Sequence, residues 1–518
     1  MPHLAEEEQN HIPRAMRQPS FYPHPTQDPI RMVQTHISHV FLTGPFAYKV
    51  KRPVNFGFLN FSTLQARHHY CLLELSRNQS YAPELYLEVV PIRFGAAGFS
   101  LTGHGKIVDY AVKMHQFDER FLFSRMFLGN RLEARHLEKL GRRLAAVHAG
   151  AEWDPVKAER YGSASAVQAV VADNYQTGER FLGRLHDKQH NHAVKTFTDH
   201  LFHEQQDLFT GRVQNGMVRL CHGDLHLNNV CWYNEDAHPF DCIEFNDAFS
   251  IIDVLYDCAF MVMDLENRNR GDLAFAFFNA WFESVYDIEG LQLLPFYLNL
   301  RAYVRAKVYS LMAEDETQSA DSRSEKEGKA AHFYELAYRY TQARPRRAII
   351  VCGLSGSGKS TVAAWLAGQL TAIHLRSDAI RKHLAGIPTT QKGDSSLYKP
   401  AFSEKTYARL IEDAGRVLDA GFSVVLDAKF DRRDQRDQAR AALLKRGVSV
   451  DFIHCRARLE TLAQRLTDRV GDVSDAGPDL LESQTQSWQP FSVEDQVLEL
   501  NTEHHWRARL GDLLGRKP

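Results

Sequence analysis

The chain has 518 residues, a hydrophobic content of 44%, a charged content of 24% and a formal net charge of −2. This length exceeds what one hydrophobic core supports, so we expect more than one domain. The near-neutral charge provides no global basic field, which argues against a polynucleotide partner.

Seven cysteines are present without a CxxC pair, which predicts buried free thiols in a reducing compartment. Residues 1–20 are polar and lack the apolar core of a signal peptide. No apolar run approaches the roughly 20 residues that cross a bilayer. We therefore expect a cytoplasmic protein with no membrane partner.

The first part of the chain has the pattern of short strands. Residues 1–30 lack periodicity, and we expect a loose arm or a helix laid on the first domain. Strands are predicted at residues 35–42 and 46–50, separated by a Thr-Gly-Pro turn, and again at residues 89–93 and 107–114.

Alternation along the second predicted strand places Lys49 and Lys51 on one face. Ser62 is expected to cap a helix that carries Glu74. A strand lysine paired with a glutamate on the next helix holds ATP phosphates in kinases, and Lys49 with Glu74 is the predicted pair. The alternative, a solvated lysine on an edge strand, is equally open from spacing alone.

From about residue 121 the apolar spacing becomes helical, as in residues 131–150, where apolar residues recur every three or four positions. Residues 313–329 are charged and rich in serine, and we expect them to be disordered. Residues 343–347 form the expected linker.

The stretch 221–247 carries the first chemical motif. Asp224 and Asn229 lie five residues apart in a predicted loop, and Asp241 follows on a strand predicted at residues 239–243. In phosphoryl transfer an aspartate accepts the proton of the attacking hydroxyl, while an asparagine and a second aspartate bind Mg²⁺. The sequence assigns these roles to Asp224, Asn229 and Asp241 in that order.

Two neighbouring residues are ambiguous. His226 is either a substrate contact or structural. Glu244, three residues after Asp241, is a candidate for a second metal or the substrate, and a hydrogen-bonded loop carboxylate is as good an interpretation.

The sequences CHGDLHLNNV and FDCIEFND resemble the aminoglycoside phosphotransferase-like branch of the protein kinase superfamily over residues 30–340. The resemblance implies ATP-dependent phosphorylation of a small-molecule hydroxyl. One departure is the segment THISHVFLTG before Lys49, which has no glycine-rich nucleotide loop.

A second phosphate motif, GLSGSGKS, lies between a predicted strand at residues 348–352 and a helix at 359–370. This context predicts a P-loop, whose backbone N–H groups and helix N-terminus cradle phosphates. Lys359 would reach the β- and γ-phosphates, and the hydroxyl of Ser360 would bind Mg²⁺. The predicted nucleotide-binding residues are Gly353, Ser355, Gly356, Ser357, Gly358, Lys359, Ser360 and Thr361.

Further candidates follow the P-loop. Asp427 ends a buried strand and is the predicted Walker B metal ligand. Asp378 is the candidate base for the acceptor hydroxyl, and Arg381 the residue that binds an acceptor or phosphate anion. Arg465 and Arg469 are four apart on a predicted helix and would close on the transferring phosphate, unless they belong to a solvated face.

This half resembles the P-loop small-molecule kinases related to gluconate kinase, chloramphenicol phosphotransferase, polynucleotide kinase and zeta toxins. The whole chain is similar to a bacterial fusion of an aminoglycoside phosphotransferase-like domain with such a domain. The implied fold is an α+β bilobal kinase-like domain followed by an α/β P-loop domain with a parallel sheet flanked by helices. The predicted boundaries are 1–30 for the arm, 31–343 for the kinase-like domain and 344–518 for the P-loop domain.

The predicted function is ATP- and Mg²⁺-dependent transfer of phosphate to a hydroxyl of a sugar, an aminoglycoside or a nucleoside-like molecule. Two alternatives remain. The kinase-like half is a non-catalytic ligand-binding module beside a P-loop ATPase or kinase, or the P-loop half acts on a polynucleotide or a nucleotide sugar.

Overall fold

The computed structural model describes residues 11–515 except 58, 97, 316, 318, 469–472, 493 and 494. The chain forms two compact units. The first unit comprises residues 1–132, 150–163 and 213–257, and the second comprises residues 133–149, 164–212 and 258–518.

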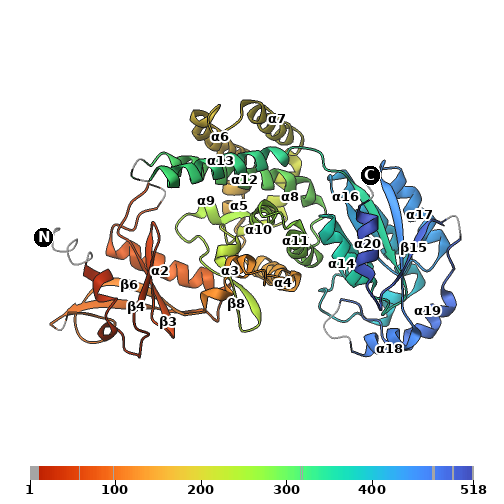
Figure 1. Ribbon diagram of the computed structural model, residues 1–518, viewed down its shortest axis with the longest axis horizontal. Helices are drawn as coiled ribbons and strands as arrows, with labels where there is room; N and C mark the ends of the chain where they lie inside the picture. The colour runs from red at the N-terminus through yellow and green to blue at the C-terminus, as the bar shows by residue number, and fades with distance from the viewer. Residues whose placement is uncertain are drawn as a thin grey trace. The chain divides into compact units, whose positions relative to one another are not determined.

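The first unit contains a six-stranded antiparallel sheet with the strand order β1-β2-β3-β6-β4-β5 (Figure 1). Its strands are β1 (Arg31–Gln34), β2 (Ser38–Leu42), β3 (Phe46–Lys51), β4 (Tyr86–Gly95), β5 (Gly98–Ser100) and β6 (Lys106–His115). Ile12 and Met16 are buried against this sheet. The strands predicted around Lys49 and at 89–93 and 107–114 are present.

Helix α2 (Leu64–Gln79) packs on β4 and β6. Its N-cap is Thr63, whose hydroxyl accepts from the backbone N–H of Ala66 at 3.1 Å. The prediction that Ser62 caps this helix is wrong, because the Ser62 hydroxyl donates instead to the side chain of Asn60 at 2.6 Å.

The remainder of the first unit holds two short strand pairs. Strands β7 (Val218–Leu220) and β10 (Ile251–Asp253) pair with each other, and β8 (Val230–Tyr233) pairs with β9 (Asp236–Pro239). Short helices flank them: α3 (Phe123–Leu128), α5 (Pro155–Gly162) and α9 (Asp247–Ser250). Strand β9 ends before Asp241, so the prediction that Asp241 lies within a strand is wrong.

The second unit begins with a helical region. Its helices are α4 (Ala134–Gly150), α6 (Ala164–Gly178), α7 (Lys188–Glu204), α8 (Gln206–Gln214), α10 (Val254–Asn267), α11 (Gly271–Val285), α12 (Leu294–Ala313) and α13 (Ala320–Arg339). The described part of the charged stretch 313–329 is largely helical, which corrects the expectation of disorder. Ser319 caps α13 by accepting from the N–H of Ser322, and α13 packs along α12 (Figure 1).

The rest of the second unit is a five-stranded parallel sheet with the order β12-β13-β11-β14-β15. Its strands are β11 (Arg347–Cys352), β12 (Ile373–Arg376), β13 (Val424–Asp427), β14 (Ser449–Arg456) and β15 (Val497–Asn501). Its helices are α14 (Lys359–Gln369), α15 (Ser377–Leu384), α16 (Pro400–Asp419), α17 (Arg433–Leu444), α18 (Leu459–Thr467), α19 (Leu481–Ser487) and α20 (Trp506–Leu514). β11 lies at the centre, buried along its whole length, as parallel strands covered on both faces require. The predicted fold class is confirmed.

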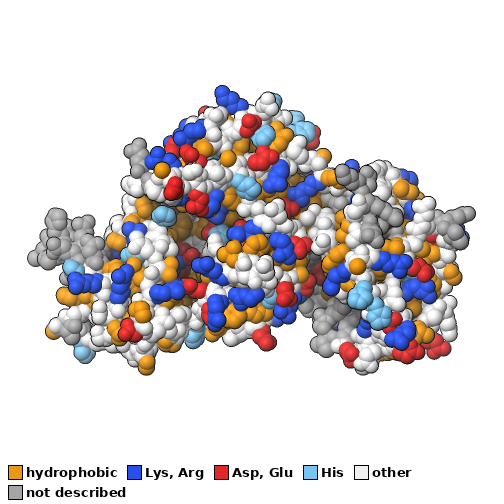
Figure 2. Space-filling model, viewed as in Figure 1, with side chains coloured by type: hydrophobic (Ala, Val, Ile, Leu, Met, Phe, Trp, Pro, Cys, Tyr) orange, Lys and Arg blue, Asp and Glu red, His pale blue; other side chains and the backbone are white. Residues whose placement is uncertain are grey.

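All seven cysteines are buried thiols outside any disulfide, as predicted. Basic and acidic side chains are interspersed over the face shown in Figure 2. Among the described residues, no helix combines the length and the apolar composition needed to cross a membrane.

Candidate active sites

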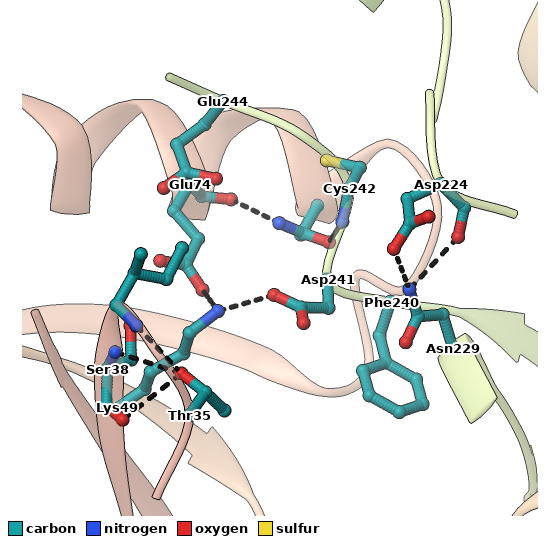
Figure 3. Close-up of polar contacts among 12 residues, drawn as sticks. Thr35, Ser38, Lys49, Glu74, Asp224, Asn229, Phe240, Asp241, Cys242 and Glu244 are labelled. Atoms are coloured by element: carbon teal, nitrogen blue, oxygen red, sulfur yellow. Dashed lines mark hydrogen bonds and ion pairs between the residues drawn. The ribbon is translucent and has the colours of Figure 1, made fainter. Parts of the chain in front are cut away.

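The first site is built around a carboxylate shared by two lysines (Figure 3). Nζ of Lys49 lies 2.7 Å from Oε1 of Glu74, and Nζ of Lys51 lies 2.7 Å from Oε2. Burial opposes the ionisation of Glu74, but the two ammonium groups outweigh it and lower its pKa to about 2. β3 lies between β2 and β6, so Lys49 is not the solvated edge-strand lysine of the alternative interpretation.

Asp241 directly follows the β8–β9 hairpin and also pairs with Lys49. Its backbone has a φ of 62°, in the left-handed region, and its N–H donates to the hydroxyl of Tyr86 at 3.2 Å. A residue in this conformation cannot continue a strand. Asp241 therefore lies beyond the end of β9, and its carboxylate faces Lys49.

Helix α2 holds the segment around Asp241 with one face. Glu74, Arg77 and Asn78 are spaced three and four apart, so their side chains share that face. The side-chain oxygen of Asn78 accepts from the N–H of Cys242 at 3.0 Å. Nη1 of Arg77 donates to the carbonyl of Ile243 at 2.7 Å. Two consecutive residues after Asp241, Cys242 and Ile243, are thus fixed by the helix that carries Glu74.

Glu244 is buried and forms an ion pair with Lys51. This contact is the one expected of a structural loop carboxylate. Its predicted role toward a substrate stays a prediction.

The loop containing Asp224 is fixed by hydrogen bonds from its backbone to a buried carboxylate. The backbone N–H groups of His222 and Gly223 donate to the buried carboxylate of Asp257 at 3.1 and 2.9 Å. Nε2 of His222 lies 3.0 Å from the carbonyl of Phe240, and burial lowers the pKa of this histidine. His222 is therefore a neutral brace between the loop and the residue before Asp241.

Asp224 and Asn229 meet across this loop (Figure 3). The Asn229 amide donates to the Asp224 carbonyl at 3.0 Å and to its carboxylate at 3.1 Å. His226 caps the short 3₁₀ helix Leu227–Asn229, and its Nε2 lies 3.3 Å from the Asp224 carboxylate. His226 thus contacts the predicted base directly.

The site combines buried cations with accessible carboxylates. The side chains of Asp224 and Asp241 are 39% and 45% exposed, whereas that of Glu74 is fully buried. Two accessible carboxylates and an amide are the oxygen donors that Mg²⁺ prefers. The residues present therefore fit a Mg²⁺–nucleotide complex beside Lys49.

The turn that precedes β2 differs from a phosphate-binding loop. The hydroxyl of Thr35 accepts from the N–H groups of Ser38 at 2.9 Å and Ile37 at 3.3 Å (Figure 3). These backbone donors already have partners within the turn. The segment without the glycines of a nucleotide-binding loop is thus a closed turn, meaning that its N–H groups donate to a side chain within the turn.

The second site is the P-loop between β11 and α14. Gly353, Gly356 and Gly358 have φ values of 145°, 79° and 82°, which side chains strongly disfavour. A Cβ at Gly353 would lie 2.5 Å from the carbonyl oxygen of Cys455, so the close packing of loop on sheet also requires glycine. Helix α14 begins at Lys359, which places Ser360 and Thr361 in its first turn. The strand–loop–helix context predicted for the P-loop is present.

Asp427 ends β13, next to the P-loop strand β11. Its Oδ2 lies 3.5 Å from Nε2 of His374 and 3.6 Å from Nε of Arg376. Burial opposes its ionisation, but His374 and Lys359 hold the pKa of Asp427 well below its ordinary value. Its Oδ1 is buried without a hydrogen-bond partner. An ionised buried carboxylate with an unsatisfied oxygen fits Mg²⁺ or its coordinated water.

Two side chains from distant elements contact the P-loop. Nη1 of Arg465 donates to the carbonyl of Gly356 at 3.2 Å and to the hydroxyl of Thr502 at 2.9 Å. The Gln484 amide accepts from the N–H of Ser355 at 3.0 Å and donates to the Ser355 hydroxyl at 3.1 Å. Gln484 thus occupies one of the loop donors expected to bind phosphate. Arg469 lies outside the described residues.

The predicted acceptor residues lie on α15. Asp378 is in its first turn. Arg381 is buried, donates to the carbonyl of Leu397 at 2.6 Å, and stacks over Tyr398 with 4.8 Å between the guanidinium and the ring centre. Its Nε is buried without a hydrogen-bond partner, so a donor remains for an anion.

Sequence reasoning missed several residues that the structure brings to the two sites. They are Arg77, Asn78 and Tyr86 in the first site, and His374, Arg376, Gln484 and Thr502 in the second. Lys51 was placed on the face of Lys49 but was given no role in the site. A local signal existed for Arg77 and Asn78, since both are one helical turn from Glu74. Gln484 and Thr502 had none, because only the folding of distant segments brings them to the P-loop.

A kinase-like lysine–glutamate–aspartate site and a P-loop in one chain together support a phosphotransferase. Residues 349–491 match the family model described as an AAA domain. Uncharacterized proteins of Mycobacterium tuberculosis and Mycobacterium bovis are each 28% identical over 459 residues, covering 88% of this chain and 89% of theirs.

Solved structures match each half of the chain. A putative aminoglycoside phosphotransferase from Ralstonia eutropha is 13% identical and covers 65% of this chain and 98% of that protein, with a TM-score of 0.38. A sugar kinase from Janibacter sp. is 24% identical and covers 33% of this chain and 93% of that protein, with a TM-score of 0.25. The residues that match the family model, 349–491, lie within the part of the chain predicted to be the P-loop domain.

Proposed function

We propose that the protein is an ATP- and Mg²⁺-dependent phosphotransferase that acts on a hydroxyl of a small molecule. The P-loop site is the principal catalyst in this proposal, and the kinase-like site is a second one. One observation carries it: beside the glycine-built P-loop, the ionised carboxylate of Asp427 is buried with one oxygen unsatisfied.

At the P-loop, backbone N–H groups of residues 353–360 would bind the phosphates, with that of Ser355 released from Gln484, and Lys359 would neutralise charge on the transferring group. Ser360 and Asp427 would hold Mg²⁺, which supplies further neutralisation when bound. Asp378 would take the proton of the acceptor hydroxyl while Arg381 orients the acceptor. Arg465 would stabilise charge that develops in the transition state.

At the kinase-like site, Asp224 would accept the acceptor proton, and Asn229 and Asp241 would hold Mg²⁺. Lys49, fixed by Glu74, would bind the nucleotide phosphates, and His226 and Glu244 would contact the substrate. A sugar, an aminoglycoside or a nucleoside-like molecule is the proposed acceptor, in a cytoplasmic setting.

One observation favours a second candidate for the kinase-like half. The turn at Thr35 has no backbone N–H free at Ile37 or Ser38, and these are the positions where kinases place donors over the phosphates. A ligand-binding module without transfer chemistry is consistent with this closed turn.

The test measures ATP consumption by the full-length protein over a panel of sugars, aminoglycosides and nucleosides. The wild type is compared with Lys359→Ala and Asp224→Asn. We expect Lys359→Ala to lower the rate by at least about 10²-fold, as removal of one transition-state charge contact does. An Asp224→Asn variant with wild-type rates on every acceptor would show that the kinase-like half is not catalytic. Acceptor-independent ATP turnover in the wild type would contradict the transferase proposal.

A further inference from the structure

Helix α11 precedes the predicted linker in sequence, yet it packs on the P-loop sheet, against α14 and β12. β12 is the edge strand of that sheet. The Asn279 side chain donates to the carbonyl of Ala372 at 3.0 Å and accepts from the N–H of His374 at 2.9 Å. Asn279 thus supplies the pair of hydrogen bonds that a neighbouring strand would give, and α11 covers the free edge.

One helical turn after Asn279, Glu283 faces the residue that ends β12. Its Oε1 lies 3.0 Å from Nη1 of Arg376, and both side chains are less than one-fifth exposed. Nε of the same guanidinium lies 3.6 Å from Oδ2 of Asp427. Arg376 is therefore placed between a carboxylate from α11 and the carboxylate proposed to bind Mg²⁺.

This arrangement has an electrostatic consequence for cation binding. A guanidinium that moves onto Asp427 reduces the negative charge available to Mg²⁺, and the effect is strong because Asp427 is buried. Glu283 competes for the same guanidinium, which at 3.6 Å forms a long ion pair with the Asp427 oxygen but lies beyond ordinary hydrogen-bond distance.

We propose that Glu283 is a positioning residue for the P-loop metal site, which keeps Arg376 from closing to hydrogen-bond distance of Asp427 and so sustains Mg²⁺ affinity. The inference rests on the proposed function of Ser360 and Asp427 as Mg²⁺ ligands. It means that a side chain from the helices before the linker sets the metal affinity of a site after the linker.

The experiment measures binding of a non-hydrolysable ATP analogue to the full-length protein by calorimetry at increasing Mg²⁺ concentrations. The variants are Glu283→Gln, Arg376→Gln and the double variant. The matched control is Glu266→Gln, because Glu266 forms a comparable ion pair with Arg344 at 3.1 Å on the neighbouring helix α10, without a contact to Asp427 among those observed.

We expect Glu283→Gln to raise the half-saturating Mg²⁺ concentration about tenfold, within the usual range of coupling between sites. Arg376→Gln should leave it equal to or below the wild-type value, and the double variant should behave like Arg376→Gln. Glu266→Gln should match the wild type. Urea unfolding of each variant checks that the fold is intact.

Three results would overturn the inference. Glu283→Gln could bind Mg²⁺ like the wild type, or the double variant could be as impaired as Glu283→Gln, which would indicate a structural role. If Glu283→Gln does not fold, weaker Mg²⁺ binding by Arg376→Gln than by the wild type would overturn the inference instead. A wild type without Mg²⁺-dependent nucleotide binding would instead overturn the proposed function, and this inference with it.

Discussion

The two candidate sites solve one problem, the placement of charge around a phosphate, in opposite ways. The kinase-like site buries two lysines on one glutamate, and its turn at Thr35 uses its own N–H groups internally. The P-loop site builds its cradle from glycine backbone in the left-handed region and leaves a buried oxygen of Asp427 unsatisfied. The N–H groups of Gly353, Ser355 and Ser357 in the P-loop also have partners, so the contrast between the sites lies in the unsatisfied oxygen of Asp427. For this reason we propose transfer chemistry first for the P-loop.

The largest expected effect concerns the shared carboxylate of the paired site. Glu74→Gln removes the carboxylate that two buried lysines share and leaves each lysine with one other partner, Asp241 or Glu244. Breaking a buried ion pair from one side costs about 3–5 kcal/mol. We expect the free energy of unfolding, measured in urea, to fall by about this amount. The matched control is Glu88→Gln, because the Glu88 side chain is 56% exposed and pairs with Lys113 at 2.8 Å. Equal losses in the two variants would contradict an internally paired site.

The pH dependence of stability tests the same carboxylate. The pKa of Glu74 is about 2 in the folded protein, against an ordinary value of 4.5. Its contribution, up to about 3 kcal/mol, is therefore complete above pH 4.5 and is lost as the pH falls toward 2. The difference in unfolding free energy between the wild type and Glu74→Gln should narrow over this range. A difference that stays constant from pH 5 to pH 2.5 would show that Glu74 is not held ionised.

Replacing Gln484, which occupies the N–H of Ser355 in the P-loop, is expected to have a smaller effect, and this effect is a gain in nucleotide affinity. Gln484→Ala frees the N–H of Ser355, so a nucleotide phosphate no longer displaces a hydrogen bond worth about 1 kcal/mol. We expect affinity for an ATP analogue to rise by about three- to tenfold in calorimetry. Gln486→Ala, an exposed position on the same helix, is the control. Weaker binding by Gln484→Ala would mean that this side chain helps to hold the nucleotide.

The smallest effect is expected at the closed turn. Thr35→Ala removes an acceptor shared by two N–H groups and should lower the unfolding free energy by about 1 kcal/mol. Nucleotide binding is then measured in a Lys359→Ala background, where the P-loop contributes least. Tighter nucleotide binding after replacement of Thr35 would show that the closed turn limits nucleotide access to the kinase-like site. Unchanged binding would show that the turn does not limit access and that Asp224 and Asp241 determine binding there.

Some elements could be predicted because their signals are local. The glycine spacing of the P-loop and the apolar run of β11 lie in consecutive residues, so the strand–loop–helix unit followed from sequence. The first half of helix α13 was missed, because its charged, serine-rich residues resemble a disordered segment. Its later apolar residues bury themselves along α12 and stabilise the whole helix.

The sequence by itself determined which groups are the candidates for the chemistry: Asp224, Asn229 and Asp241 in one half, and Lys359, Ser360 and Asp427 in the other. Only the tertiary structure decided which charges meet, including the sharing of Glu74 by two lysines and the line from Glu283 through Arg376 to Asp427. The residues of a backbone motif such as the P-loop are neighbours in the sequence, so the motif can be recognised there. The partners of a buried charge are chosen by packing among segments that are distant in the chain, and by the high cost of leaving such a charge unpaired.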